Sequence, residues 1–411
     1  MNRNIFFLLI FALIVRLYFV FIYPQSPVIT DAKRYDVLGW NLASGNGFVN
    51  ETGKAELGRG PGYPFFLAVV YRIFGHSYHY ARFSQVLFSM FTLLLIFLLA
   101  KDTFGKNTAF LSLIIASFYP PFLSYNGILY AETLFTFFIA LSSYLLFLGN
   151  RQKKWWIYIL LGVVSGCAVL VRSEFILLFL CFFALTIIYS RENLKKFIYV
   201  ALIAALVIAP WTIRNYKVSG RFVLVSSLFG SMLWISSYEG EWLEWHNDDP
   251  YYAGLIKGLD EVEKDKILWA EGIKNIKENP SRYLKSCFKY LGRFWIGGHS
   301  NTFYGLRDSL PNYFFAKAYG KVIIKVMFLI FNTALIILGG CGIMTAIRTL
   351  RDKKGELMFL ISPIFIMMMM HTLLFGTARY QVPIMPLMII FAAFGLFSLQ
   401  QVRMELRKNE N

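Results

Sequence analysis

The chain contains ten apolar stretches of a length suited to crossing a lipid bilayer. A membrane-spanning helix needs roughly 17–25 apolar residues, and helices satisfy their own backbone hydrogen bonds in lipid. The first stretch is too long for a signal-peptide core, so we expect it to be retained as a span. The sequence predicts an all-α polytopic membrane protein. The ten stretches are Asn4–Tyr23, Tyr80–Ala100, Thr108–Leu123, Leu129–Leu148, Trp155–Val171, Phe175–Tyr189, Phe197–Trp211, Val322–Ile347, Leu357–Phe375 and Tyr380–Leu399.

The formal charge of +17 raises the question of a polyanionic partner. Lysine and arginine stand mainly in short clusters between the apolar stretches, a pattern typical of topology signals and of attraction to anionic lipid. With 57% hydrophobic and only 16% charged residues, the composition is that of a membrane protein. We therefore expect the lipid bilayer as a partner and no nucleic acid.

The orientation follows from which loops carry the basic clusters, because cytoplasmic loops are enriched in lysine and arginine. The clusters occupy alternate loops, and the short loops on the opposite side carry only Arg172 and Arg379. This pattern predicts a multi-pass protein of the cytoplasmic (inner) membrane with both termini cytoplasmic. Residues 24–79 and 212–321 are then extracytoplasmic. The clusters are Lys101 and Lys106; Arg151, Lys153 and Lys154; Arg191, Lys195 and Lys196; Arg348, Arg351, Lys353 and Lys354; and Arg403, Arg407 and Lys408.

Three parts are expected along the chain. Residues 1–211 form an N-terminal transmembrane module whose first outer loop, 24–79, carries the catalytic residues. Residues 212–321 form an extracytoplasmic region with an interfacial helix, and residues 322–411 supply the last transmembrane helices. The overall prediction is a bundle of about ten transmembrane helices, with juxtamembrane helices in the first outer loop and a small mixed extracytoplasmic region.

The two outer segments have their own expected elements. In the first, Asp31–Leu42 is predicted as a helix capped by Thr30, and Phe65–Phe74 as a short amphipathic helix at the interface. In the second, Arg221–Ser226 is a possible strand and a long helix is expected from about Asp260 to Glu278. Apolar residues at three- and four-residue spacing from Tyr283 to Trp295 indicate the interfacial helix.

Asp31, Arg34 and Tyr35 directly follow the first apolar stretch at helical spacing. A carboxylate, a guanidinium and a phenol on one helix face at the membrane surface indicate a site that takes a proton from one substrate and holds an anion on another. The structural alternative is that Asp31 caps the helix, but Thr30 can fill that position. Asp36 is expected to point elsewhere, into solvent.

Glu132 is the second candidate carboxylate, near the outer end of the fourth stretch. A charge inside a bilayer is costly, so Glu132 is expected to face an outer cavity beside Asp31. The alternative is a side chain that reaches the membrane boundary without a further role. Tyr119-Pro120-Pro121 is expected to break the preceding span and to help open that cavity.

Cations that suit a phosphate stand at several outer positions. Arg59 lies among glycines that permit close backbone approach, and Arg379 lies in the last outer turn. Arginine donates two parallel hydrogen bonds to a phosphate, so we expect Arg34, Arg59 and Arg379 to bind a donor phosphate. Arg379 as a mere anchor at the lipid headgroups is the alternative. Arg172 and Glu174 are expected to pair across a tight outer turn.

Absent motifs narrow the chemistry. The sequence shows no phosphate-binding glycine loop, no dinucleotide fingerprint and no serine nucleophile elbow. His76 and His79 have no neighbouring ligand at metal-site spacing, so no cofactor is expected, although a divalent metal is left open. An outward-facing enzyme needs a donor that is already activated within the lipid, and a polyprenyl-phosphate-linked sugar fits. Its reaction needs a base for the acceptor hydroxyl and cations for the leaving phosphate.

The motifs together resemble the GT-C superfamily of integral-membrane glycosyltransferases, in the branch of the protein O-mannosyltransferases and lipid A aminoarabinose transferases. They occur in the same order and topological positions over nearly the whole chain. They are Asp31-Ala32-Lys33-Arg34-Tyr35, Arg59-Gly60-Pro61-Gly62-Tyr63-Pro64, Ser124–Phe135, Pro210-Trp211-Thr212-Ile213-Arg214-Asn215 and Arg379-Tyr380-Gln381-Val382-Pro383.

The resemblance implies an inverting transferase of hexosyl or pentosyl groups, with Asp31 as catalytic base and Glu132 as a second acid of the outer cavity. It implies that Arg34, Arg59 and Arg379 lie near the donor phosphate. Supporting residues would be Tyr35, Tyr63, Tyr380, Arg172 and Glu174. The acceptor (glycan, lipid or protein) is left open, because Ala32 replaces the second of two adjacent acids often found in the family and no acceptor-binding module follows.

Two other functions remain as alternatives. A membrane glycan polymerase or ligase also combines many spans with a large outer segment. A lipid or glycan transporter usually shows inverted repeats and polar residues at mid-depth, whereas here the polar residues gather at one face. The trio after the first stretch favours the glycosyltransferase.

Overall fold

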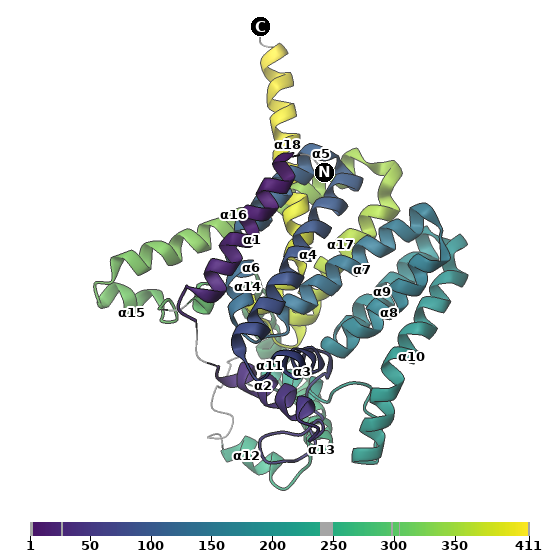
Figure 1. Cartoon of the computed structure of the whole chain (residues 1–411), viewed down its shortest axis with the longest axis vertical. Helices are drawn as coiled ribbons and strands as arrows, with labels where there is room; N and C mark the ends of the chain where they lie inside the picture. Colours follow the sequence, from purple (N-terminus) through teal and green to yellow (C-terminus); the bar gives the residue numbers. More distant parts are fainter. Residues whose placement is uncertain (1–2, 26–27, 239–249, 297–298, 304, 410–411) are drawn as a thin grey trace.

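The computed structural model describes residues 3–25, 28–238, 250–296, 299–303 and 305–409, with side chains described up to residue 399. It is built from helices (Figure 1). In chain order they are α1 (Arg3–Phe21), α2 (Thr30–Ala43), α3 (Gly62–Phe74), α4 (Tyr78–Phe104), α5 (Lys106–Phe118), α6 (Pro120–Ser124), α7 (Glu132–Gln152), α8 (Trp155–Val171), α9 (Phe175–Tyr189), α10 (Leu194–Ser219), α11 (Phe229–Tyr238), α12 (Pro250–Ile256), α13 (Glu261–Glu278), α14 (Pro280–Ile296), α15 (Leu310–Phe315), α16 (Tyr319–Thr349), α17 (Lys354–Leu373) and α18 (Met385–Asn409).

All ten predicted apolar stretches lie in helices, which confirms a multi-span membrane protein. Among the described residues, seven helices are long and apolar enough to cross a membrane, and the bent pair of α5 with α6 and the turn after it would make an eighth. The other two stretches are α8, of 17 residues, and α9, of 15 residues. At about 1.5 Å per residue, these two are shorter than a bilayer core of about 30 Å.

The predicted break in the third stretch is confirmed. The helix axes before and after Tyr119 differ by 56°. Tyr119 has an extended backbone (φ −64°, ψ 114°), as expected for a residue before proline. Pro120 then occupies the first turn of α6, where a missing amide N–H costs nothing.

The outer elements gather at one end of the molecule. Figure 1 shows α2, α3, α11, α12 and α13 together at the end opposite to the N-terminus and the projecting C-terminal part of α18. Helix α2 packs on α3, and α11 packs on α13. The first outer loop is bonded directly to the second outer segment, because the Ser227 amide donates to the Leu57 carbonyl at 3.0 Å. The two outer segments therefore form one end of the fold.

The predicted strand Arg221–Ser226 is wrong, and the outer region is helical instead of mixed. The described residues contain no strand, only an isolated bridge between Val49 and Ala55. Residues 223–225 are held by side chains of α10 in place of a strand partner. Trp211 Nε1 and Asn215 Nδ2 donate to the Val225 carbonyl at 3.0 and 3.1 Å, and Thr212 donates to Leu224 at 2.8 Å.

The start of α2 also differs from the prediction. Thr30 does not cap the helix with its side chain; it is the first residue of α2, and its φ is +53°. A β-branched residue rarely adopts this left-handed conformation, which strains the backbone. The predicted helix at 260–278 is confirmed as α13, where Asp260 and Glu263 form a reciprocal capping box.

Candidate functional site

The sequence-predicted residues come from five separate parts of the chain and meet near the end of the molecule formed by α2, α3, α11 and α13. Asp31 lies in the first turn of α2, and Arg59 lies in the loop before α3. Glu132 is the first residue of α7. Arg172 and Glu174 stand between α8 and α9, and Arg379 lies in a short 3₁₀ segment, Ala378–Ile384, before α18. The fold brings most of the predicted site together.

Asp31 is held by two arginines. Arg59 Nη2 donates to Asp31 Oδ1 at 2.6 Å, and Arg379 Nη1 donates to Oδ2 at 2.7 Å. Burial raises the pKa of Asp31, but the charges of Arg59 and Arg379 together outweigh it and hold that pKa well below the ordinary range. The Asp31 side chain keeps 27% exposure, so an ionised carboxylate faces open space.

From Arg379 the ion pairs continue inward. Arg379 Nε donates to Glu132 Oε1, and Arg172 Nη1 donates to the same oxygen at 3.0 Å. Arg172 Nε also pairs with Glu174 Oε1 at 2.9 Å, which confirms the expected pairing across the turn. We name these six residues the Asp31 chain: three carboxylates (Asp31, Glu132, Glu174) against three guanidiniums (Arg59, Arg172, Arg379).

Glu132 is completely buried. Its position at the N-terminus of α7 stabilises its negative charge, and its Oε2 has no hydrogen-bond partner within the described part of the chain. It lies beside Asp31 through the shared partner Arg379, but it does not line the cavities described below. Its contacts are those of a residue that positions Arg172 and Arg379.

The predicted aromatic residues surround the six residues of the Asp31 chain. The Arg59 guanidinium lies over the Tyr35 ring at 5.9 Å, and Arg172 lies over Tyr380 at 4.7 Å. Tyr380 stacks on His371 with ring centroids 4.1 Å apart. Tyr63 is fully buried, packs edge-on to Tyr35 and donates its hydroxyl to Gln85 at 3.0 Å. Tyr63 therefore supports the site from behind.

The glycines around Arg59 allow the chain to pack against itself. A Cβ on Gly60 would lie 2.6 Å from the Leu170 carbonyl oxygen, and one on Gly62 would lie 2.6 Å from the Val171 amide nitrogen. The close approach that these glycines permit is therefore made by the end of α8. This close approach places the loop of Arg59 directly against the turn that carries Arg172.

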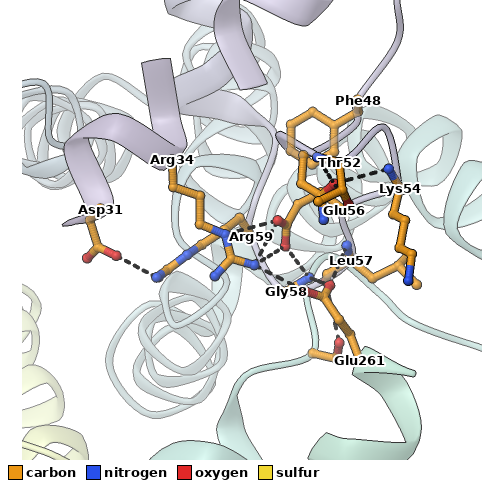
Figure 2. A network of polar contacts seen from close by, with 12 residues as sticks. Asp31, Arg34, Phe48, Thr52, Lys54, Glu56, Leu57, Gly58, Arg59 and Glu261 are labelled. Atoms are coloured by element: carbon orange, nitrogen blue, oxygen red, sulfur yellow. Dashed lines mark hydrogen bonds and ion pairs between the residues drawn. The ribbon is translucent and has the colours of Figure 1, made fainter. Parts of the chain in front are cut away.

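Arg34 turns away from Asp31, as Figure 2 shows. Its Nε and Nη2 donate to the two oxygens of Glu56 at 2.9 and 2.7 Å, and Nη2 also donates to Glu261 at 3.1 Å. Glu261 Oε2 accepts from the Leu57 and Gly58 amides at 2.8 and 2.7 Å. We name Arg34, Glu56 and Glu261 the Arg34 cluster. Glu56 and Glu261 were not predicted, since no local spacing links them.

Asp36 is a correction. It was expected in solvent, but it is buried. It accepts hydrogen bonds from the Tyr71 hydroxyl at 2.6 Å, from His76 Nε2 at 2.9 Å and from the Tyr78 hydroxyl at 3.0 Å. These partners come from α3, the turn after it and the start of α4. Asp36 therefore joins α2 to the neighbouring helices, and His76 has a structural role there.

Two adjoining cavities open beside Asp31. The Asp31 cavity, of about 850 Å³, is lined by Asp31 as its only carboxylate among the described residues. The arginine cavity, of about 440 Å³, has no acidic residue in its described lining. Both share a wall of Ile29, Thr30, Tyr130, Arg293, Thr377 and Arg379. Arg379 therefore reaches both cavities while it holds Asp31.

Three residues of the arginine cavity were missed by the sequence analysis: Arg293, His299 and Arg307. Among the described contacts, neither Arg293 nor Arg307 has an ion pair. His299 is buried and bonds Gln381 through Nε2 at 2.7 Å, while its Nδ1 has no partner within the described residues. Burial lowers the pKa of His299 to about 4, so this imidazole is neutral at physiological pH. Arg293 lies within the segment from Tyr283 to Trp295, which the sequence predicted only as an interfacial helix.

Among the described residues, no three histidine, cysteine or carboxylate side chains are grouped as metal ligands. The carboxylates of the Asp31 chain are instead neutralised by guanidiniums.

Comparison with known proteins gives a family match and a fold. Residues 58–213 match the family model described as dolichyl-phosphate-mannose-protein mannosyltransferase. A protein of Aquifex aeolicus (strain VF5), described only as an uncharacterized protein, is 32% identical over 163 residues. That match covers 39% of this chain and 33% of the relative.

Two kinds of solved structure resemble the chain. The archaeal oligosaccharyltransferase AglB from Archaeoglobus fulgidus, in complex with an inhibitory peptide and a dolichol-phosphate, aligns with a TM-score of 0.58 at 15% identity. The alignment covers 100% of this chain and 52% of the AglB chain. The present chain therefore spans about half the length of AglB. ArnT from Cupriavidus metallidurans bound to undecaprenyl phosphate aligns at 0.47 and 13% identity, over 95% of this chain and 76% of its own.

The mannosyltransferase model covers the loop of Arg59, Glu132 and the Arg172 turn, and the fold likeness to AglB extends over the whole chain. The expected resemblance to the GT-C superfamily of membrane glycosyltransferases is thereby confirmed.

Proposed function

We propose that the protein is a membrane glycosyltransferase that moves a sugar from a polyprenyl-phosphate-linked donor to an acceptor hydroxyl on the extracytoplasmic face. The observation that carries this proposal is an ionised, part-exposed carboxylate, Asp31, at the wall of a cavity that also reaches Arg293, which has no ion pair among the described contacts. The family match is consistent with it.

Asp31 acts as the general base in this proposal. It would accept the proton of the acceptor hydroxyl as the oxygen attacks the anomeric carbon. A retaining mechanism needs a second carboxylate as nucleophile. The described lining of the Asp31 cavity holds none, and Glu174, which borders a smaller cavity together with Asp31, is paired with Arg172. We therefore propose a single displacement that inverts the anomeric centre.

A low pKa makes Asp31 a weak base in the free enzyme, and substrate binding can correct this. A donor phosphate near Arg379 competes with Asp31 for that guanidinium, whose Nη1 lies 2.7 Å from the carboxylate. Losing part of this attraction raises the pKa of Asp31. The base would thus become stronger when the leaving group is in place.

The arginine cavity is the better location for the phosphate. In the Asp31 chain three carboxylates already neutralise three guanidiniums, so Arg59 and Arg379 offer little net attraction to another anion. The arginine cavity adds Arg293 and Arg307 without an acid. We propose that Arg293, which has no ion pair among the described contacts, supplies the positive charge for the phosphate. Arg379, which lines the same shared wall, adds a hydrogen bond, while Arg59 positions Asp31. His299 Nδ1, an acceptor when Nε2 is the donor, suits a sugar hydroxyl.

The first test is Asp31→Asn, measured as sugar transfer in membranes with labelled polyprenyl-phosphate sugar at matched protein levels. Removing a general base typically lowers the rate by about 10²–10⁴-fold. Glu51→Gln is the matched control, because Glu51 is an exposed carboxylate of the same loop that pairs only with Lys33 in the described contacts. Wild-type transfer by Asp31→Asn would remove Asp31 as the base.

The second test is Arg293→Gln, measured as binding of polyprenyl phosphate to the purified protein. Charge-assisted hydrogen bonds to phosphate are worth about 1.5–3 kcal/mol, so we expect binding to weaken by roughly tenfold to a hundredfold. The control is Arg282→Gln, on the same helix but outside the two cavities. Unchanged affinity in Arg293→Gln would move the phosphate elsewhere and would leave the role of Asp31 intact.

A further inference from the structure

A second amphiphilic groove lies at the opposite end of the molecule from Asp31. It has a volume of about 610 Å³, within the roughly 300–1,000 Å³ of ligand sites. The start of α1, the end of α4, the start of α5 and a late part of α18 form it, and Figure 1 shows these helix ends together. The groove is lined by Asn4, Ile5, Phe97, Lys101, Lys106, Asn107, Phe110, Leu111, Ile114 and Phe397.

The lining divides into a charged rim and an apolar floor. Lys101 and Lys106 flank the turn at Gly105 and are both exposed, with Asn4 and Asn107 beside them. Within the described contacts neither lysine has an acidic partner. Asp102 lies between them in sequence but does not line the groove, and its carboxylate accepts from the Tyr144 hydroxyl at 3.2 Å. The rim is therefore positively charged.

The apolar floor continues onto the lipid-facing surface of the protein. Phe110 of α5, in the lining, is 37% exposed. Phe11 of α1 and Phe118 of α5 are 50% and 44% exposed and contact each other. Side chains this apolar on membrane-spanning helices face acyl chains. An occupant must therefore be an amphiphile with an anionic head at the lysines and hydrocarbon along α1 and α5.

We propose that this groove is a binding site for an anionic phospholipid of the leaflet opposite to the Asp31 cavity. Basic pockets between transmembrane helices bind anionic lipid headgroups. The two lysines and two asparagines of the rim supply hydrogen-bond donors, which a lipid phosphate can accept and an acyl chain cannot. The uncapped first turn of α5, whose amides begin at Lys106, adds a partial positive charge at the same rim. This site is independent of the proposed transfer reaction.

The experiment is native mass spectrometry of the full-length protein titrated with phosphatidylglycerol or with phosphatidylcholine of the same acyl chains. We expect wild-type protein to retain phosphatidylglycerol selectively. The double variant Lys101→Gln/Lys106→Gln should lower that retention by about tenfold, since each basic residue near an anionic lipid contributes substantially. The control Lys353→Gln/Lys354→Gln removes two lysines that do not line the groove and should leave the retention unchanged.

A second variant tests the groove itself. Leu111→Trp fills the apolar floor without altering charge, and it should lower the retention of phosphatidylglycerol at unchanged melting temperature. Equal retention of both lipids by the wild type would overturn the proposal. So would an equal loss in both lysine pairs, because the effect would then come from general surface charge. If polyprenyl phosphate displaces phosphatidylglycerol from the Arg293→Gln variant, the groove would be assigned to polyprenyl phosphate. That result would overturn the proposal that its ligand is a phospholipid.

Discussion

Two charge networks begin on the same turn of α2 and develop in opposite ways. In the Arg34 cluster, Arg34 bonds both oxygens of Glu56, and Glu261 uses its second oxygen for two backbone amides. In the Asp31 chain, Arg59 Nε and Glu132 Oε2 are buried without a hydrogen-bond partner in the described structure. The described Arg34 cluster is satisfied internally, whereas the Asp31 chain keeps unbonded polar atoms, and its Arg59 lines the Asp31 cavity.

The difference separates a structural role from a chemical one. Buried polar atoms without partners cost about 1–3 kcal/mol each, and a binding or catalytic role is one explanation for keeping them. The Arg34 cluster fixes the backbone at Gly58, one residue before Arg59. It therefore holds the Asp31 chain in place without lining its cavity.

The largest difference between the two networks is expected when one arginine of each is replaced by glutamine. Arg379→Gln removes a donor to both Asp31 and Glu132 and, in our proposal, to the leaving phosphate. The loss of one such donor typically lowers kcat by about 10²–10³-fold. Arg34→Gln is the matched variant, and its transfer rate should stay within about tenfold of the wild type, because Arg34 lies outside the cavity. Initial rates in membranes at matched protein levels give both numbers.

If Arg34→Gln loses transfer as severely as Arg379→Gln while the protein remains folded, the distinction between the networks is wrong. Arg34 would then rejoin the phosphate-binding set that the sequence analysis predicted. A normal rate in Arg379→Gln would remove the shared wall from the mechanism.

Much of the fold was predictable because membrane insertion depends on local composition. The length of each apolar stretch predicted a helix, and Tyr119-Pro120-Pro121 predicted the 56° break. The pairing of Arg172 with Glu174 across their tight turn was predictable because only Ser173 separates the two residues in the sequence. Properties set by neighbours in sequence were the ones that local patterns could supply.

The rest depended on partners far apart in sequence. Arg34 and Asp31 share a helix turn, but Arg34 pairs with a residue 227 positions away and Asp31 with one 348 positions away. Asp36 is buried because donors from α3 and α4 satisfy it, and residues 223–225 need no strand partner because α10 side chains bond them. No periodicity along one segment reveals these contacts.

A smaller effect is expected from Glu261→Gln, which weakens the Arg34 cluster alone. Hydrogen bonds to a charged group are worth about 1.5–3 kcal/mol when buried, but Glu261 is 36% exposed, and we expect a loss of about 1 kcal/mol. Looser positioning of Arg59 should lower transfer by less than about tenfold. Thermal unfolding of the purified protein and transfer rates measure the two changes.

Glu263→Gln is the control for that variant, because Glu263 lies on the same helix and pairs with the exposed Arg221. It should leave the transfer rate unchanged. A rate loss without any change in stability for Glu261→Gln would show that Glu261 acts on the substrate and not through Gly58.

The smallest expected effect concerns pH. The pKa of Asp31 is held below its ordinary value by Arg59 and Arg379, so the carboxylate is ionised above the unfolded pKa of about 3.9 and protonates only as the pH falls below it. His299, with a pKa of about 4, is also uncharged above pH 5. Wild-type transfer should therefore vary little between about pH 5 and 8 on account of these two groups. Arg59→Gln removes one of the lowering charges, so its acid limb, normalised to its own plateau, should shift upward in pH. These expectations apply to kcat/KM, which reports the free enzyme. A wild-type acid limb of kcat/KM with its midpoint near pH 6 would contradict the proposed coupling between Arg59 and Asp31, because the base would then titrate as if its arginines were absent.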